Sequence, residues 1–72
     1  MPLVHCNFIK DVFSEEEKQQ AIANITDAIV DVKGEGIRDL VMVMVHEVDS
    51  GAVGKAGDIV TRDKVESAVA AG

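Results

Sequence analysis

The chain has 72 residues, 47% of them hydrophobic, and 13 acidic against 7 basic residues give it a formal net charge of −6. An acidic chain without a basic cluster would be repelled by a phosphate backbone, which argues against a nucleic-acid partner. No apolar run approaches the roughly 20 residues that cross a bilayer, and the first residues lack the pattern of a secretory signal. We therefore expect a cytoplasmic protein without a membrane partner.

The size of the chain allows a single domain, residues 1–72, with a thin core. The sequence contains two Phe and neither Trp nor Tyr, so the core must be built from aliphatic residues. Scaffolds of this length usually need disulfides, a metal or oligomerisation to become stable. Only one cysteine, Cys6, is present, and no cluster of metal ligands. Self-association is the remaining option.

The first predicted element is a β-strand over residues 2–9. Val4, Cys6 and Phe8 recur with the period of two that is typical of a strand with one buried face. Pro2 stands at its head, where proline is tolerated although it cannot donate to a ladder.

The second predicted element is a helix over residues 15–33. Ser14 followed by Glu17 is a capping box. Apolar residues then repeat at spacings of three and four, which predicts an amphipathic helix. Lys33 and Gly34 supply the signal for its C-terminus.

A second strand is predicted over residues 39–47, around the run "LVMVMV". A strand, a helix and a second strand form a βαβ unit, which favours parallel strands and a right-handed crossover. The run is apolar on both faces, whereas one helix covers only one face. The other face is expected to meet another copy of the chain.

The segment "DSGAVGKAGD" predicts a β-hairpin over residues 50–58, because its spaced glycines suit tight turns. A short C-terminal helix is predicted over residues 62–70, capped by Thr61. The predicted fold class is therefore α/β (α+β): a single βαβ unit with a C-terminal β-hairpin, completed by oligomerisation.

Most candidate chemical groups have an ordinary structural explanation. His5 and His46 fall on neighbouring predicted strands, but two partly exposed histidines are a weak indication of a metal site. Cys6 has no basic neighbour in sequence that would lower its pKa, which favours a core role. The glycines lack the "GK[ST]" ending of a phosphate-binding loop. We expect neither a metal nor a cofactor.

Pro2 differs, because removal of Met1 would turn its nitrogen into a secondary amine. An α-amine titrates at about 7.7 to 8.0 in model peptides, and apolar surroundings favour its neutral form. Such an amine could act as a general base near physiological pH.

The Met-Pro start, the capped helix "SEEEKQQAIANITDAI", the strand "LVMVMVHEV" and the glycine hairpin together resemble the tautomerase superfamily, in its short 4-oxalocrotonate tautomerase-like subgroup. The resemblance spans about residues 2–57. It implies a βαβ subunit, a dimer with a four-stranded sheet, and usually a trimer of such dimers. It also implies that Pro2 carries a proton between carbon and oxygen of a small keto-enol substrate.

The same resemblance suggests further substrate-binding positions. Where well-studied members have two arginines, this chain has Phe13 and Met42, and Val53 replaces an aromatic residue of the hairpin. Arg38 and Lys55 are nearby cations that could serve instead. The resemblance implies that those arginines bind a substrate carboxylate through two parallel hydrogen bonds. Phe and Met cannot form such bonds, so we expect poor binding of dicarboxylates.

The predicted function is thus that of a tautomerase, an isomerase acting by proton transfer through Pro2. Two alternatives remain at this point. The chain could be a non-catalytic or partner-dependent subunit of a mixed hexamer, or an oligomer that binds a small ligand without chemistry.

Overall fold

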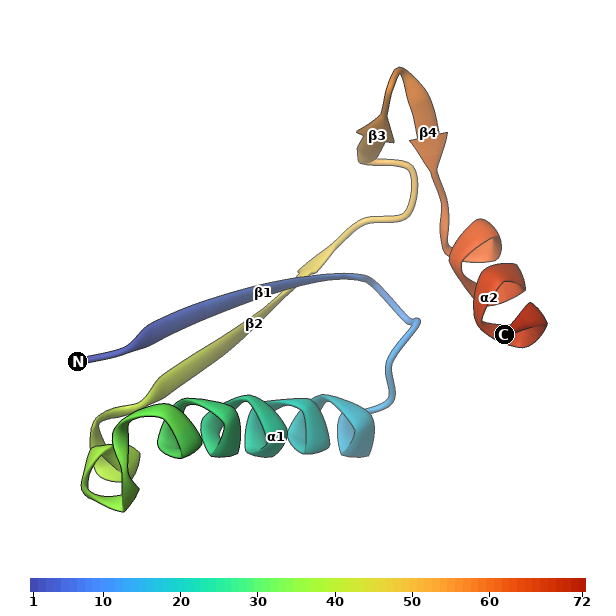
Figure 1. The fold of residues 1–72 in the computed structure, drawn as a ribbon. Helices are drawn as coiled ribbons and strands as arrows, with labels where there is room; N and C mark the ends of the chain where they lie inside the picture. Colours follow the sequence, from blue (N-terminus) through green and yellow to red (C-terminus); the bar gives the residue numbers. More distant parts are fainter.

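The computed structural model describes residues 1–72. In chain order its elements are β1 (Leu3–Ile9), α1 (Glu15–Lys33), a 3₁₀-helix η1 (Glu35–Leu40), β2 (Met42–Val48), β3 (Val53–Lys55), β4 (Asp58–Val60) and α2 (Arg62–Ala71). Figure 1 shows α1 along one side of the β1–β2 pair, and the β3–β4 hairpin with α2 projecting beyond the far end of the strands. The predicted βαβ arrangement with a C-terminal hairpin is confirmed.

The two long strands run parallel, from the pair Leu3 and Met42 to the pair Ile9 and Val48. Parallel neighbours need a long crossover, which α1 and η1 provide. The two strands form a sheet of their own, and β3 and β4 form a separate antiparallel pair.

The start of α1 is fixed by its capping box. The Ser14 hydroxyl accepts a hydrogen bond from the amide of Glu17 at 3.1 Å, and the Glu17 carboxylate accepts one from the amide of Ser14 at 2.9 Å. At the other end, Gly34 has φ 99° and donates its N–H to the carbonyl of Val30 at 2.7 Å. Glycine suits this left-handed position because it has no Cβ.

The second strand begins later than the sequence predicted. Residues 39 and 40 belong to η1, and β2 starts at Met42. The register gives the reason, because Met42 lies opposite Leu3, the first residue of β1. Earlier residues have no strand to pair with, so they close 3₁₀ turns such as the bond from the Val41 amide to the Arg38 carbonyl, 3.2 Å long.

The hairpin also lies further along the chain than the predicted range 50–58. Residues 49–52 form a turn of their own, closed by a 3.0 Å bond from the Ala52 amide to the Asp49 carbonyl. The hairpin strands follow, joined by Ala56 and Gly57 at φ 53° and 84°. Positive φ at both central residues is the requirement of the type I′ turn that matches strand twist.

The single chain has almost no core. Val30, at 7% exposure, is its only buried residue. The accessible surface is 5248 Å², whereas a compact monomer of 7.7 kDa would expose roughly 4,300 Å². The radius of gyration is 14.7 Å, against about 11 Å for a compact domain of this length. The single chain therefore leaves much of its apolar surface in solvent.

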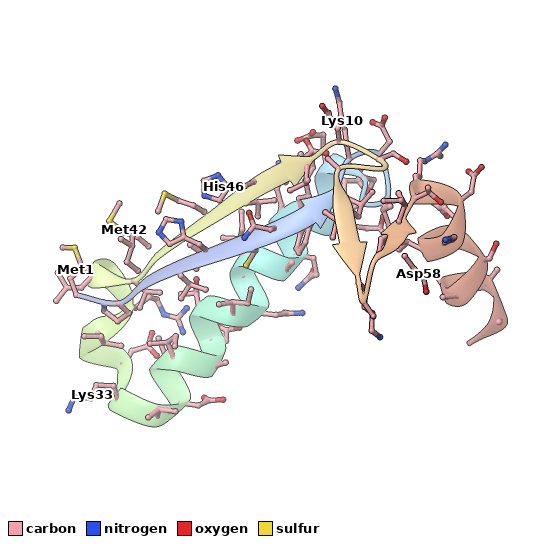
Figure 2. The ribbon with its side chains drawn as sticks, turned by 90° about the horizontal axis from the view of Figure 1, so that it is seen from above. Met1, Lys10, Lys33, Met42, His46 and Asp58 are labelled. Atoms are coloured by element: carbon pink, nitrogen blue, oxygen red, sulfur yellow. The ribbon has the colours of Figure 1, made fainter.

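Part of that surface, including Leu3 and Met42, lies on the side of the β1–β2 pair away from α1. Strand residues alternate between faces, and those facing away from α1 form what we call the open sheet face: Leu3, His5, Asn7, Ile9, Met42, Met44, His46 and Val48. Figure 2 looks onto this face, with Met42 and His46 labelled along it. As for membranes, neither helix has the length and apolar character needed to span one.

Candidate functional site

Pro2 is held at the head of the parallel pair. Its carbonyl accepts a hydrogen bond from the amide of Met42 at 3.0 Å, which extends the ladder one residue before β1. The residue is half-buried. Proline has no N–H to donate, but at this position the ladder uses only its carbonyl. The sheet therefore loses no hydrogen bond.

The surroundings of Pro2 are apolar. Leu3 and Met42 form the first strand pair beside it, and these residues are 53% and 49% exposed. Leu40, at the end of η1, is 44% exposed. Met1 precedes Pro2 and lies largely in solvent. This end of the sheet therefore presents an open apolar surface.

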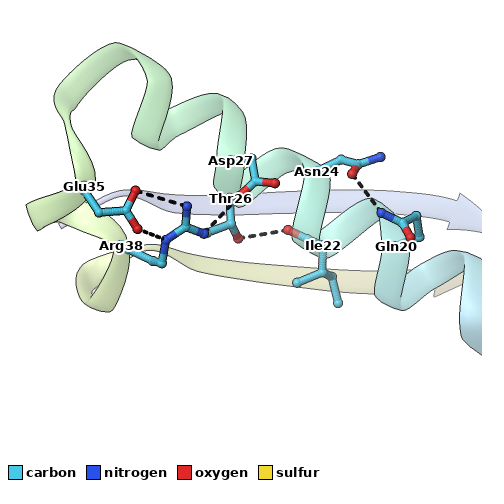
Figure 3. A network of polar contacts seen from close by, with 7 residues as sticks. All are labelled: Gln20, Ile22, Asn24, Thr26, Asp27, Glu35 and Arg38. Atoms are coloured by element: carbon cyan, nitrogen blue, oxygen red, sulfur yellow. Dashed lines mark hydrogen bonds and ion pairs between the residues drawn. The ribbon is translucent and has the colours of Figure 1, made fainter.

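Arg38 lies on η1 at the same end of the sheet, but acidic partners occupy its guanidinium (Figure 3). Its Nε lies 2.6 Å from an oxygen of Glu35, and its Nη1 lies 2.9 Å from an oxygen of Asp27. The hydrogen bond to Glu35 makes the largest contribution to raising the pKa of Arg38 above its usual range, and the bond to Asp27 adds to it. The same contact with Arg38 lowers the pKa of the Glu35 carboxyl.

The other predicted site residues lie at the opposite end of β1 and β2. Phe13 follows β1 and stacks on Phe8, with ring centroids 4.3 Å apart. Val53 and Lys55 lie on β3, beyond the end of β2 (Figure 1).

The strands therefore separate the predicted residues into two groups. Pro2, Met42 and Arg38 lie at one end, and Phe13, Val53 and Lys55 at the other. A seven-residue strand spans about 20 Å. One chain does not bring the two groups together, and it contains no detectable cavity.

Sequence reasoning missed the two carboxylates that hold Arg38. The spacing of Glu35 and Arg38 by three residues is a recognisable signal for a helical ion pair. The contact with Asp27 joins η1 to α1 across 11 residues, and no local pattern indicates it.

Comparisons with known proteins agree with this arrangement. The model of the family described as tautomerase enzymes matches residues 2–62. The probable tautomerase K2 of Dickeya dadantii (strain 3937) is 33% identical over 67 residues, covering 93% of this chain and 98% of that protein. A solved structure from work on the 4-oxalocrotonate tautomerase isozymes of Methylibium petroleiphilum superposes with a TM-score of 0.73 at 25% identity, covering 93% of this chain and 98% of the other.

The parallel βαβ unit with its hairpin is thus a small tautomerase-type subunit. The chain belongs to the tautomerase family and is similar to its 4-oxalocrotonate tautomerase-like members. The resemblance seen in the sequence is confirmed, and these relatives support a tautomerase-type function.

Proposed function

We propose that Pro2, once Met1 is removed, is the general base and then the general acid of a keto-enol tautomerisation. The observation that carries the proposal is the bond between the Pro2 carbonyl and the Met42 amide, because it holds the proline ring at a defined place on an apolar surface. While Met1 is attached, the Pro2 nitrogen is an amide and has no basicity. Family membership supports the same chemistry.

The proposed reaction moves one proton and leaves the catalyst unchanged. The neutral Pro2 amine takes the hydroxyl proton of an enol, and the electron pair of the O–H bond forms the carbonyl. The former double bond supplies electrons to the α-carbon, which takes a proton from the ammonium of Pro2. In the reverse direction the amine removes the α-proton. Proton transfer by a positioned group typically contributes about 10²- to 10⁴-fold in rate.

The charges near Pro2 favour an uncharged or monoanionic substrate. Arg38 on η1 lies beside β2 and is already neutralised by two carboxylates. Met42 presents a thioether at the edge of the proposed site. A dicarboxylate would lose hydration there without gaining a cationic partner. The apolar residues at this end of the sheet suit the ring of a phenylpyruvate-like enol.

Self-association would complete the site. The two groups of predicted residues lie at opposite ends of one chain, but Val53 and Lys55 of one copy can face Pro2 of another. A hexamer, or a dimer as its building block, would also cover the open sheet face. Its formation is supported by the excess accessible surface of the single chain.

The first test measures ketonisation of phenylenolpyruvate by three forms of the chain. These are the processed protein, the Pro2→Ala variant and a form that retains Met1, each identified by intact mass. We expect the processed protein to be faster than Pro2→Ala by about 10²- to 10⁴-fold, and the Met1 form to be inactive. Equal rates for all three would refute the role of Pro2.

The second test asks whether two copies share a site. Pro2→Ala and Val53→Asp chains are each assayed alone, then unfolded together and refolded as a mixture. If one copy supplies Pro2 and another supplies Val53, mixed oligomers contain some intact sites and regain activity. A mixture no more active than its separate components would show that the site does not combine Pro2 and Val53 from different copies.

A further inference from the structure

Two histidines meet in the middle of the open sheet face. His5 lies on β1 and His46 on β2, and the Nδ1 atom of His5 is 3.1 Å from the Nε2 atom of His46. Both residues are exposed. They are not direct strand partners, since His5 lies opposite Met44 and His46 lies opposite Asn7. Their side chains reach diagonally toward each other between the strands.

The rings are arranged edge to edge. Their planes are within 6° of each other and their centroids are 5.3 Å apart. This separation exceeds the nitrogen–nitrogen distance by about the combined radii of two five-membered rings. The two nitrogens must therefore lie close to the line between the centroids. A hydrogen bond in this geometry needs one nitrogen that carries a hydrogen and one that presents its lone pair to it.

We propose that the imidazoles of His5 and His46 form a binding site for a divalent transition-metal ion, which replaces the proton between the two nitrogens. Neutral imidazole is a ligand for zinc, copper and nickel. In this site His5 binds through Nδ1 and His46 through Nε2. The inference does not rest on the role of Pro2, because neither histidine belongs to the proposed catalytic site.

The spacing of the two nitrogens suits one ion. Zn–N bonds are about 2.0 to 2.1 Å long, so two nitrogens on a tetrahedral zinc ion lie roughly 3.3 Å apart. The observed 3.1 Å is close to that value. The rings must still tilt, because their lone pairs now point at each other and not at a common point to one side. Both side chains are exposed in the single chain, so they can make this adjustment before another copy covers the face, which is why the ion is also added during refolding.

The charges around the pair do not repel a cation, although the open sheet face itself carries no carboxylate. The chain has a formal net charge of −6, which raises the local concentration of cations. No lysine or arginine belongs to the open sheet face. Two protein ligands leave other positions on the ion free, to be filled by water or by a second copy packed on the same face. Among divalent first-row ions, Cu²⁺ should bind most tightly.

The test measures binding of Zn²⁺ and Ni²⁺ to the folded, assembled protein, and also to protein refolded in the presence of each ion. Calorimetry gives the affinity and the stoichiometry, and NMR of the imidazole ring protons identifies the ligands. We expect one ion for each His5–His46 pair, with both rings perturbed. His5→Gln and His46→Gln should each weaken binding by at least about tenfold, the loss typical even of an outer-shell partner.

Asn7→Gln is the matched control, because Asn7 lies on the same face opposite His46 and leaves both imidazoles in place. It should bind the ions as the parent does, and so should Pro2→Ala. If a histidine variant does not fold, the change in the ring-proton shifts of the parent protein on adding the ion still shows whether both imidazoles bind it. The proposal is overturned if neither ring responds to millimolar ion under either loading condition, or if the folded His5→Gln, His46→Gln double variant binds as tightly as the parent.

Discussion

The ammonium of Lys18 lies 3.1 Å from a carboxylate oxygen of Glu47 and so ties the start of α1 to the end of β2. The same ammonium is 2.7 Å from Glu15. The Lys18 side chain is only 14% exposed, so its stem is covered while its charge is shared by two acids. Hydrogen bonds to Glu15 and then to Glu47 raise the pKa of Lys18, and the bond to Lys18 lowers the pKa of Glu47.

This ion pair predicts a pH-dependent contribution to stability. Glu47 has a lowered pKa in the folded state, so its contribution is present above the ordinary carboxyl value of 4.5 and is lost as the pH falls through the folded value. Lys18 has a raised pKa, so its contribution is present below 10.5 and is lost as the pH rises through the folded value. The pair should therefore stabilise the fold throughout the neutral range.

The measurement is the melting temperature of the parent and of Glu47→Gln as a function of pH. We expect the parent to melt higher at neutral pH and the difference to shrink as the pH falls below about 4.5. In a Lys18→Met background, Glu47→Gln should have much less effect. A difference that stays constant from neutral to acid pH would show that the pair does not cause it.

Ser14→Ala should destabilise the chain by about 1 kcal/mol, because it removes one half of a complete capping box. Chemical unfolding at a fixed protein concentration measures the change, since association contributes to apparent stability. Ser67→Ala is the control, because Ser67 is exposed inside α2 and caps nothing. If both variants unfold alike, the cap does not contribute as the geometry indicates.

Arg38→Met should lower the melting temperature and leave the KM for a monocarboxylate enol close to that of the parent. The reason is that Arg38 already bonds Glu35 and Asp27. Lys33→Met serves as the control, because it removes an exposed cation that forms no ion pair. A rise in KM of about tenfold or more, the size of a lost charge-assisted hydrogen bond, would mean that Arg38 leaves its partners to bind substrate.

Met44→Asp should weaken self-association, because it places a carboxylate in the middle of the open sheet face. Burying an unpaired charge at an interface is costly. Sedimentation velocity at micromolar concentration should show the parent as an oligomer and the variant as smaller species, unfolded or nearly so. Lys33→Met, which alters the exposed end of α1 and not this face, should sediment as the parent does. A parent that sediments as a folded monomer would refute the self-association.

The elements with local signals were the ones that the sequence could predict. Ser14 and Glu17 define the start of α1 by contacts three residues apart, and the apolar, β-branched run around Val43 is typical of a strand. The start of β2 was wrong because it depends on the position of Leu3, 39 residues earlier in the chain. The hairpin was misplaced because the turn at Asp49–Ala52 takes up residues that the glycine pattern assigned to a strand.

The candidate site was less predictable than the fold. Pro2 and Met42 could be named from the sequence, and their contact follows from the strand register. The separation of Val53 from Pro2 could not be foreseen, because it depends on the direction in which the chain leaves β2. The hydrogen bond from Arg38 to Asp27 depends on the position of η1 relative to α1. Neither the composition nor the spacing of residues predicts that position.

A sheet of only two strands has two outer edges, and both β1 and β2 carry unpaired backbone donors and acceptors along theirs. An exposed edge is a template for the addition of another strand. We therefore expect these edges to pair wrongly between chains when the concentration of newly made protein is high. Overproduction should favour inclusion bodies over soluble protein, and slow synthesis at low temperature should reverse this balance.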